Sequence, residues 1–438
     1  MRAAITRAYP WLALIFLIVL YTSNYIDRQI LALMVKPIRE DLQINDTQYS
    51  LLSGFAFAVF YTFAAIPLGY LVDNASRRWL ITSAVGFWSL ATALCGATSS
   101  FAGLFLARVG VGIGQAPFTP AVYSLLSEYF AKEKLGRALS FYHLGIPIGS
   151  GFALVVGGSL IDLFTDVSVT LPFVGVLKPW QMVFIAIGLP GLLLALATPF
   201  VLKEPQRQKA ADGKVERPGL PTVFKYIWQH IGFYGGFFTA VALGSMAFYG
   251  FAAWMPSYLQ RVFGYSAGDA GLLLGASTAL LGIPGGLLAG WNADRLIARG
   301  RADGHILMAA SYVVGAFVCG ALGAIMPIQS LSIILVAGLG FFSFTWAGVM
   351  TAALQIMTPN RMRGQISAIY LFVSGFAGMG LGPTAVGVVT DFVFGRGEDV
   401  GKSMAVVGTI CLGLTLVALA VTRNFVLRAA PVPALKTA

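Results

Sequence analysis

Gly69-Tyr-Leu-Val-Asp73 recurs as Gly290-Trp-Asn-Ala-Asp294, 221 positions further along the chain. A second stretch, Gly136-Arg-Ala-Leu-Ser-Phe-Tyr142, is matched by Gly364-Gln-Ile-Ser-Ala-Ile-Tyr370, 228 positions away. Both separations lie close to half of the 438 residues. The sequence therefore consists of two consecutive repeats, and each is expected to fold on the same plan.

The composition of the chain indicates that these repeats fold in a lipid bilayer. Hydrophobic residues make up 57% of the sequence and charged residues only 11%, whereas charged residues make up about 25% of an average soluble domain. About a dozen apolar runs lie between Trp11 and Val421, and each approaches the roughly 20 residues that a helix needs to cross the hydrocarbon core. We therefore predict an all-α membrane protein with twelve transmembrane helices in two six-helix bundles.

The predicted spans are separated by short polar segments, with one exception. The segment from Lys203 to Lys225 is the longest polar stretch, contains three prolines and has no apolar periodicity. It is expected to join an N-terminal bundle (residues 1–202) to a C-terminal bundle (residues 223–438), with residues 203–222 as a cytoplasmic linker. The predicted spans are residues 9–35, 48–72, 80–98, 101–129, 138–163, 179–201, 223–258, 266–291, 304–325, 329–357, 365–393 and 402–424.

The basic residues indicate how the chain is oriented. If the N-terminus lies inside, the inner loops and both tails hold 21 of the 29 Lys and Arg residues, and the outer loops hold six. Because basic residues concentrate in cytoplasmic loops, both termini are predicted to be cytoplasmic, in the plasma (inner) membrane. The net charge of +11 is thus explained without a nucleic-acid partner, which would require a basic face on a soluble domain.

The sequence contains no motif for a cofactor, a metal or enzymatic catalysis. The glycines from Gly110 to Gly114 lie within an apolar run rather than between a strand and a helix, so they predict close helix packing and not dinucleotide binding. Cys95, Cys319 and Cys411 are far apart in apolar surroundings and are expected to be packing residues. We therefore expect no cofactor, no bound metal and no enzymatic activity.

Three ionisable residues lie well inside predicted spans. Inserting such a residue costs at least about 2.5–3.5 kcal/mol, so these residues are normally paired and functional. At 1.5 Å per residue, Asp27 lies about 13 Å from the outer end of its helix and Arg108 about 10 Å, so the two are expected at similar depth. Arg28 follows Asp27 directly and points about 100° away from it around the helix.

Gly69-x-x-x-Asp73-x-x-x-Arg77-Arg78 resembles the signature loop between the second and third helices of the major facilitator superfamily, although Asn74 and Ser76 replace the usual Arg and Gly. Gly290-x-x-x-Asp294-Arg295 is similar to the partner loop, and Arg108-Val-Gly-Val-Gly-Ile-Gly114 to the Arg motif of the fourth helix. The resemblance covers the whole chain and implies that helices one and four face each other across a central cavity. It also implies an inner gate, in which Arg77 pairs with Glu128, formed by Asp73, Arg77, Glu128, Asp294 and Arg295.

A narrower resemblance is to the Spinster-like subfamily of lysolipid and sphingoid-phosphate transporters. It rests on Asn24-Tyr-Ile-Asp27-Arg28, on Arg108 to Ala116, and on Phe141-Tyr142 with Ile146-Pro-Ile-Gly-Ser-Gly151. Gln115 departs from this subfamily, which usually has glutamate there. Because a carboxamide does not titrate, Gln115 is expected to line the cavity below Arg108 without carrying a proton.

Two interpretations of Asp27 and Arg108 remain open. Protonation of Asp27 could release Arg108 to hold an anionic substrate, or the two could form a permanent ion pair that fixes helix packing. The first is favoured because Phe248 and Val336 occupy the equivalent positions of the second repeat, where a general packing device would have been kept. His143 could also relay protons, but a neutral, hydrogen-bonded packing histidine is the favoured interpretation, so His143 is the next proton-site candidate after Asp27. The predicted substrate ligands are Arg28, Arg108, Gln115, Tyr249 and Trp346.

A cavity that is charged on one side and aromatic on the other suits an amphiphile with an anionic head. The leading hypothesis is a monomeric secondary transporter, coupled to protons, that moves a lysolipid or sphingoid phosphate by alternating access. One alternative is a symporter of small organic anions, which would need polar ligands from both repeats. Another is a passive lipid scramblase or channel, which would need no titrating carboxylate. The expected partners are thus the anion, protons and the lipid bilayer.

Overall fold

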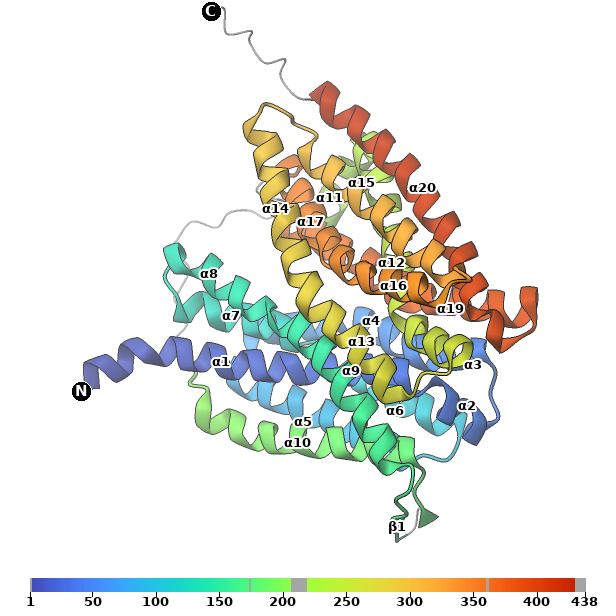
Figure 1. Cartoon of the computed structure of the whole chain (residues 1–438). Helices are drawn as coiled ribbons and strands as arrows, with labels where there is room; N and C mark the ends of the chain where they lie inside the picture. The colour runs from blue at the N-terminus through green and yellow to red at the C-terminus, as the bar shows by residue number, and fades with distance from the viewer. Residues whose placement is uncertain (1, 173–174, 206–218, 360–361, 430–438) are drawn as a thin grey trace, which may run out of the picture. The chain divides into compact units, whose positions relative to one another are not determined.

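The computed structural model describes residues 2–172, 175–205, 219–359 and 362–429. These residues are almost entirely helical (Figure 1), apart from one antiparallel hairpin formed by β1 (Thr170–Leu171) and β2 (Gly175–Val176). The hairpin lies in the predicted loop between the fifth and sixth spans. The predicted all-α class is confirmed.

The helices of the first repeat follow the predicted spans in order. The fourth span is interrupted at Pro117, because proline has no backbone N–H to continue the helical hydrogen bonds, and the fifth is interrupted at Leu144. The elements are α1 (Arg2–Gln29) with a 3-10 extension (Ile30–Leu33), α2 (Val35–Leu42), α3 (Asp46–Ser50) joined by a π-helical turn (Leu51–Phe55) to α4 (Ala56–Asn74), α5 (Arg77–Cys95), α6 (Phe101–Gln115), α7 (Phe118–Tyr129), α8 (Lys132–His143), α9 (Gly145–Phe164) and α10 (Pro179–Val201).

The helices of the second repeat contain several π-helical turns, of which the longest is Ser374–Leu381. The elements are α11 (Leu220–Gln229), α12 (Ile231–Phe263), α13 (Ala267–Ser277) joined by a π turn (Thr278–Gly282) to α14 (Ile283–Ala298), α15 (Gly304–Ala316) with π (Phe317–Leu322) and 3-10 (Gly323–Ile325) turns, α16 (Gln329–Ser343), α17 (Thr345–Met357), α18 (Arg363–Val373), the π segment Ser374–Leu381, α19 (Gly382–Val388) with a π turn (Val389–Phe394), a 3-10 turn (Gly397–Asp399) and α20 (Val400–Ala429).

Ten helical segments in the described part of the chain are long and apolar enough to cross a bilayer. The predicted second and third spans are not among these ten, but they are continuous helices over residues 46–74 and 77–95. The structure is therefore consistent with the twelve predicted spans.

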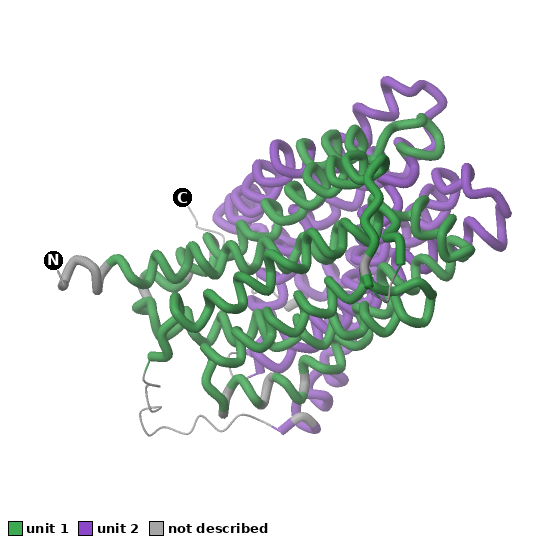
Figure 2. The backbone as a smooth tube through the Cα atoms, turned by 90° about the horizontal axis from the view of Figure 1, so that it is seen from below, with its two compact units in different colours: residues 1–213, 259–276 green, residues 214–258, 277–438 purple. Residues whose placement is uncertain are grey.

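Two compact units divide the chain (Figure 2), one comprising Met1–Gly213 and Leu259–Ala276 and the other Lys214–Tyr258 and Ser277–Ala438. Each unit holds most of one repeat. The segment Leu259–Ala276 departs from this pattern, because by sequence it belongs to the second repeat, where it covers the end of α12, a short loop and nearly all of α13. In the structure it packs with the first repeat.

Close packing in the first unit brings α6 against the second span. α5 lies between α10 and α6, while α1 runs along α9. A Cβ atom on Gly112 of α6 would come within 2.6 Å of the carbonyl oxygen of Phe57, so only glycine allows the two backbones to approach this closely. This contact agrees with the packing surface expected for Gly110 to Gly114.

Candidate functional site

Asp27 on α1 and Arg108 on α6 lie next to each other inside the first unit. Both are buried, with 2% and 1% of their surface exposed. The Nη1 group of Arg108 donates a hydrogen bond of 3.2 Å to the backbone carbonyl of Asp27, so this contact does not use the carboxylate. The carboxylate lies beside Thr92 of α5. A proton could therefore bind to Asp27 and leave this hydrogen bond intact.

Several buried polar atoms near this pair have no hydrogen-bond partner among the described residues. They include both polar side-chain atoms of Asn24 and the Nε of Arg108. Leaving such a group unsatisfied costs about 1–3 kcal/mol, so buried polar groups normally bind another polar group or water. The interior of the first unit near Asp27 is thus polar enough to hold water or the polar groups of a ligand.

Arg28, the next residue of α1, lies among aromatic rings and beside a neutral amide. Its Nε donates a hydrogen bond of 2.8 Å to the Oε1 of Gln115 on α6. Its guanidinium carbon lies 5.1, 4.8 and 4.9 Å from the ring centres of Tyr25, Phe57 and Tyr61. Cation–π contacts contribute about 0.5–1 kcal/mol at exposed sites and more when desolvated. Arg28 is therefore a half-buried cation with an aromatic surround and a neutral amide as a hydrogen-bond partner.

The aromatic part of this site was not predicted from the sequence, because the two aromatic ligands predicted there, Tyr249 and Trp346, both belong to the second repeat. Tyr21, Tyr25 and Arg28 follow one another at positions i, i+4 and i+7, which lie on one face of a helix. Phe57 and Tyr61 have the i, i+4 spacing on the second span, and their rings are stacked with centres 5.3 Å apart. This spacing was the signal in the sequence that could have located the cluster.

His143 on α8 lies at the border of the aromatic cluster. Its Nε2 is 3.0 Å from the hydroxyl of Tyr123, and its ring centre lies 6.3 Å from that of Tyr21 and 5.7 Å from that of Tyr142. These neighbours are aromatic and hydroxyl groups rather than carboxylates. The arrangement suits a hydrogen-bonded packing histidine, and the proton relay stays a secondary hypothesis.

Tyr249 and Trp346, the two predicted aromatic ligands, belong to the second unit. Tyr249 on α12 is half-buried, and its ring centre lies 5.0 Å from that of Phe248. Trp346 on α17 is only 5% exposed and lies against Tyr312, with ring centres 5.2 Å apart. The indole Nε1 of Trp346 has no hydrogen-bond partner in the described parts of the chain. Substrate contact stays a prediction for both residues.

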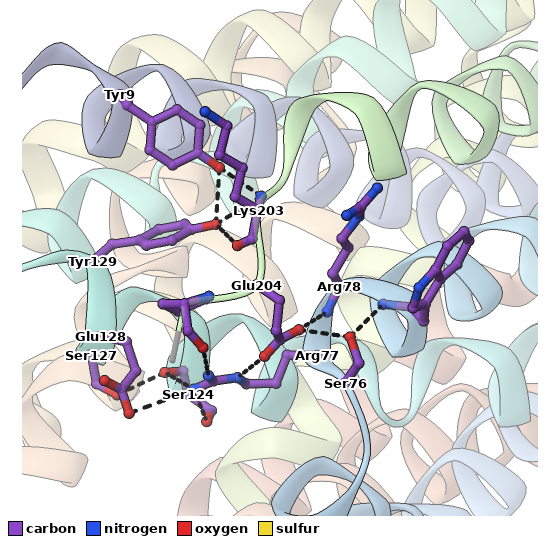
Figure 3. Close-up of polar contacts among 12 residues, drawn as sticks. Tyr9, Ser76, Arg77, Arg78, Ser124, Ser127, Glu128, Tyr129, Lys203 and Glu204 are labelled. Carbon is purple, nitrogen blue, oxygen red and sulfur yellow. Dashed lines mark hydrogen bonds and ion pairs between the residues drawn. The ribbon is translucent and has the colours of Figure 1, made fainter. Parts of the chain in front are cut away.

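At the start of α5, Arg77 is buried and its shortest ion pair is with Glu204 (Figure 3). The Nε of Arg77 donates to Glu204 at 2.9 Å, whereas the predicted partner Glu128 lies 3.8 Å from Nη1. Glu204 also accepts hydrogen bonds from the Ser76 hydroxyl at 2.7 Å and the Arg78 amide at 2.8 Å. Partial burial alone would raise the pKa of Glu204, but these hydrogen bonds and the charge of Arg77 lower that pKa overall. Glu204 therefore joins the end of α10 to the first turn of α5.

Lys203, the residue before Glu204, is also bound to the bundle (Figure 3). Its amide donates to the hydroxyl of Tyr9 at 2.7 Å, and the hydroxyl of Tyr129 donates to its carbonyl. The two tyrosine hydroxyls are themselves 3.0 Å apart. The first residues of the predicted linker thus contact α1, α5 and α7. Glu204 was not predicted from the sequence, because it lies in the polar stretch that follows the sixth span, where an acid is ordinary.

The second repeat has an ion pair at a similar place, with the charges exchanged. Asp303, at the N-cap of α15, accepts a hydrogen bond of 2.6 Å from Arg423 of α20, and Arg301 adds two of 3.2 Å. Burial alone would raise the pKa of Asp303, but the hydrogen bonds and charges of the two arginines lower that pKa overall. The last helix thus supplies the cation here, whereas Glu204, in the segment that follows α10, supplies the anion in the first repeat.

The predicted gate residues of the second loop are exposed. The side chain of Asp294 is 82% exposed and lies 4.0 Å from His305. The guanidinium of Arg295 lies over the ring of Trp291, at 5.1 Å from its centre. The side chain of Asp73 falls outside the described residues. A joint gate of the two loops therefore stays a prediction.

The described residues present no evident metal site. No group of three or more His, Cys, Asp or Glu side chains within them is placed to hold a metal ion. Cys95, Cys319 and Cys411 are buried free thiols. The polar sites described above are thus formed by charged side chains that are buried or paired, and not by clustered metal ligands.

Comparison with known proteins gives matches over nearly the whole chain. The model of the Major Facilitator Superfamily matches residues 17–383. The probable L-galactonate transporter of Escherichia coli is 26% identical over 86% of this chain and 83% of its own length, and protein spinster homolog 1 of Xenopus laevis is 27% identical over 88% and 74%. The crystal structure of a bacterial homolog to the human lysosomal transporter Spinster, inward-facing and unoccupied, is 24% identical with a TM-score of 0.78, and covers 97% of this chain and 99% of that one.

Proposed function

Because this chain belongs to the Major Facilitator Superfamily and is a Spinster-like, multi-pass membrane transporter, we propose that it moves an amphiphilic anion, such as a lysolipid or sphingoid phosphate, by proton-coupled alternating access. The observation that carries this proposal is the aromatic surround of Arg28, one residue from the buried Asp27. A lysolipid has the complementary form, since its anionic head can accept hydrogen bonds from a guanidinium. The first carbons of its tail would then contact the rings.

Proton coupling is assigned to Asp27. A carboxylate that is 2% exposed is costly to keep charged unless cations lie nearby, and Arg108 and Arg28 supply them here. When Asp27 is protonated, its carboxyl group is neutral. The two arginines then no longer balance its charge and can bind an anionic substrate. One proton and one anion would therefore be bound together and released together.

We further propose Gln115, Tyr249 and Trp346 as substrate ligands and the inner loops as a gate. The excess of basic residues in the inner loops supports cytoplasmic termini. The protein is proposed to act as a monomer in the plasma (inner) membrane.

A second candidate substrate is a small organic anion such as a sugar acid. The observation that favours it is the pair of amides near the cations: Asn24 is buried without hydrogen-bond partners for its amide among the described residues, and Gln115 contacts Arg28. Amides of this kind bind sugar hydroxyls. The similarity to a probable L-galactonate transporter also favours a sugar acid as the substrate.

The test is transport by the purified protein in liposomes with an imposed proton gradient. Uptake of a radiolabelled lysolipid, a sphingoid phosphate and L-galactonate is compared for the parent, Arg28→Gln and, as a matched control, Arg396→Gln, which changes an exposed arginine. We expect gradient-driven uptake of one of the two lipids, lost in Arg28→Gln and kept in the control. Uptake of L-galactonate alone would select the second candidate. Lipid movement that ignores the gradient would contradict proton coupling and indicate a scramblase.

A further inference from the structure

The carboxylate of Asp46 is bound by one arginine from each repeat. Asp46 begins α3 and is fully buried, with 0% of its surface exposed. Arg261, near the end of α12, donates from Nη1 and Nη2 to the two carboxylate oxygens, each at 2.7 Å. Arg39 of α2 adds an ion pair of 3.0 Å to Oδ1. Two-pronged arginine–carboxylate pairs of this kind are among the strongest polar contacts in proteins.

The backbone around Asp46 holds this carboxylate in a fixed position. The amide of Gln48 donates to the Asn45 side chain at 2.8 Å, and the amide of Asn45 donates to the Gln48 side chain at 3.1 Å. This reciprocal capping box defines the first turn of α3. The Nε of Arg39 donates to the carbonyl of Ile44 at 3.2 Å. The first repeat therefore presents Asp46 and Arg39 as a preformed site for Arg261.

A second carboxylate of the first repeat binds the start of α13. Asp162 of α9 accepts hydrogen bonds from the Gly268 amide at 3.0 Å and from the Ser266 hydroxyl at 3.2 Å. An anion at this place also interacts favourably with the helix dipole. The segment Leu259–Ala276 is thus held by polar contacts at Arg261 and again at Ser266 and Gly268.

From Ala267 onward, α13 lies alongside α9 (Figure 1). A Cβ atom on Gly271 would come within 2.0 Å of the carbonyl oxygen of Leu154, and one on Gly158 within 2.4 Å of that of Ala267. Any larger side chain at these glycines would force the two helices apart. The contact is therefore a close fit between a helix of the first repeat and a helix that belongs by sequence to the second.

From this arrangement we propose that Asp46, Arg39 and Arg261 form the latch of the outer gate. The inference rests on alternating access, which is part of the proposed function, and not on the identity of the substrate. Opening the predicted outer side separates the segment Leu259–Ala276 from the first repeat and breaks the pair between Asp46 and Arg261. Arg39 stays with Asp46, because both belong to the first repeat, and so neutralises the carboxylate while the gate is open.

The latch can be tested by thiol labelling of Ala267→Cys in purified protein whose three native cysteines are replaced by alanine. Ala267 is only 9% exposed and lies in the α9–α13 contact, so a maleimide should react with this thiol when the contact opens. The labelling rate is compared among the parent, Asp46→Asn, Arg261→Gln and Gly271→Ala. Lys178→Gln is the matched control, because Lys178 is 57% exposed and pairs with Asp41 at 3.7 Å.

We expect Asp46→Asn and Arg261→Gln to raise the labelling rate about tenfold, since loss of a two-pronged charged pair shifts the population of the open state. Gly271→Ala should raise it without any change of charge, and Lys178→Gln should not. Equal rates in the parent and in all monodisperse variants would overturn the latch. Faster labelling without transport of either lipid or of L-galactonate would leave the latch standing and contradict the proposed substrates instead.

Discussion

Replacing Glu204 by glutamine removes one negative charge from the contact between α10 and α5 and changes little else. The glutamine oxygen can still accept from the Ser76 hydroxyl and the Arg78 amide, but Arg77, whose side chain is 2% exposed, loses its nearest anion. A hydrogen bond to a charged group contributes about 1.5–3 kcal/mol. Glu128 lies 3.8 Å from Arg77 and offsets part of the loss. We therefore expect the first bundle to lose about 1–2 kcal/mol of stability.

The assay uses Cys95, a fully buried thiol of α5, as the reporter of unfolding. With Cys319 and Cys411 replaced by alanine, a thiol-reactive dye reports the exposure of Cys95 as the purified protein is heated. At about 2–4 °C per kcal/mol for a bundle of this size, the unfolding midpoint of Glu204→Gln should fall by about 2–8 °C. Glu40→Gln, which neutralises an exposed acid of the same unit, should leave it unchanged.

The pH dependence of this difference gives an independent check. The pKa of Glu204 is lowered in the folded protein, so its stabilisation is present above the ordinary glutamate pKa and is lost as the pH falls through the lowered folded value. The parent and Glu204→Gln should therefore converge in acid. If the two midpoints agree at neutral pH, or differ equally at all pH values, the charge of Glu204 does not stabilise the bundle and the reasoning is wrong.

Further predictions concern the transport site and the inner loops. Asp27→Asn should abolish proton-driven uptake and keep substrate exchange measurable, whereas Arg108→Ala should lose substrate binding; unchanged gradient dependence in Asp27→Asn would move the proton site elsewhere, with His143 next. Arg28→Lys keeps the charge but loses the Nε hydrogen bond to Gln115, so the KM for the transported anion should rise about tenfold, which uptake kinetics would measure. Cysteines placed in the Gly69 and Gly290 loops should both react with an impermeant maleimide from the cytoplasmic side, and reaction of only one would contradict the predicted topology.

The fold and the buried charges could be predicted because each requires a pattern that is visible in the sequence itself. A membrane span requires a long apolar run, so hydropathy alone locates the helices. A charge within such a run is costly, so Asp27, Arg28 and Arg108 stood out for the same reason. The structure places Asp27 next to Arg108, although their hydrogen bond uses the backbone carbonyl of Asp27.

Other parts of the site depend on distances that no sequence pattern records. Glu204 lies in a polar stretch where an acid is ordinary, and only the fold brings it to within 2.9 Å of Arg77, nearer than the predicted partner Glu128. The packing of Leu259–Ala276 with the first repeat could not be predicted from its place in the second. It rests on contacts such as the pair between Asp46 and Arg261, which join residues 215 positions apart and leave no mark in the pattern of either repeat.

The exchanged charges of the Arg77–Glu204 and Asp303–Arg423 ion pairs bear on how the chain assembles in the membrane. Two repeats built on one plan offer similar docking sites for their last helices, so either helix could bind in the wrong bundle during insertion. If the end of α10 docked in the second repeat, Glu204 would face Asp303, and if α20 docked in the first, Arg423 would face Arg77. Each mistake places like charges together, whereas correct docking forms the ion pairs seen at 2.9 and 2.6 Å. The order of charges in these two pairs therefore favours docking of each last helix in its own bundle over docking in the other.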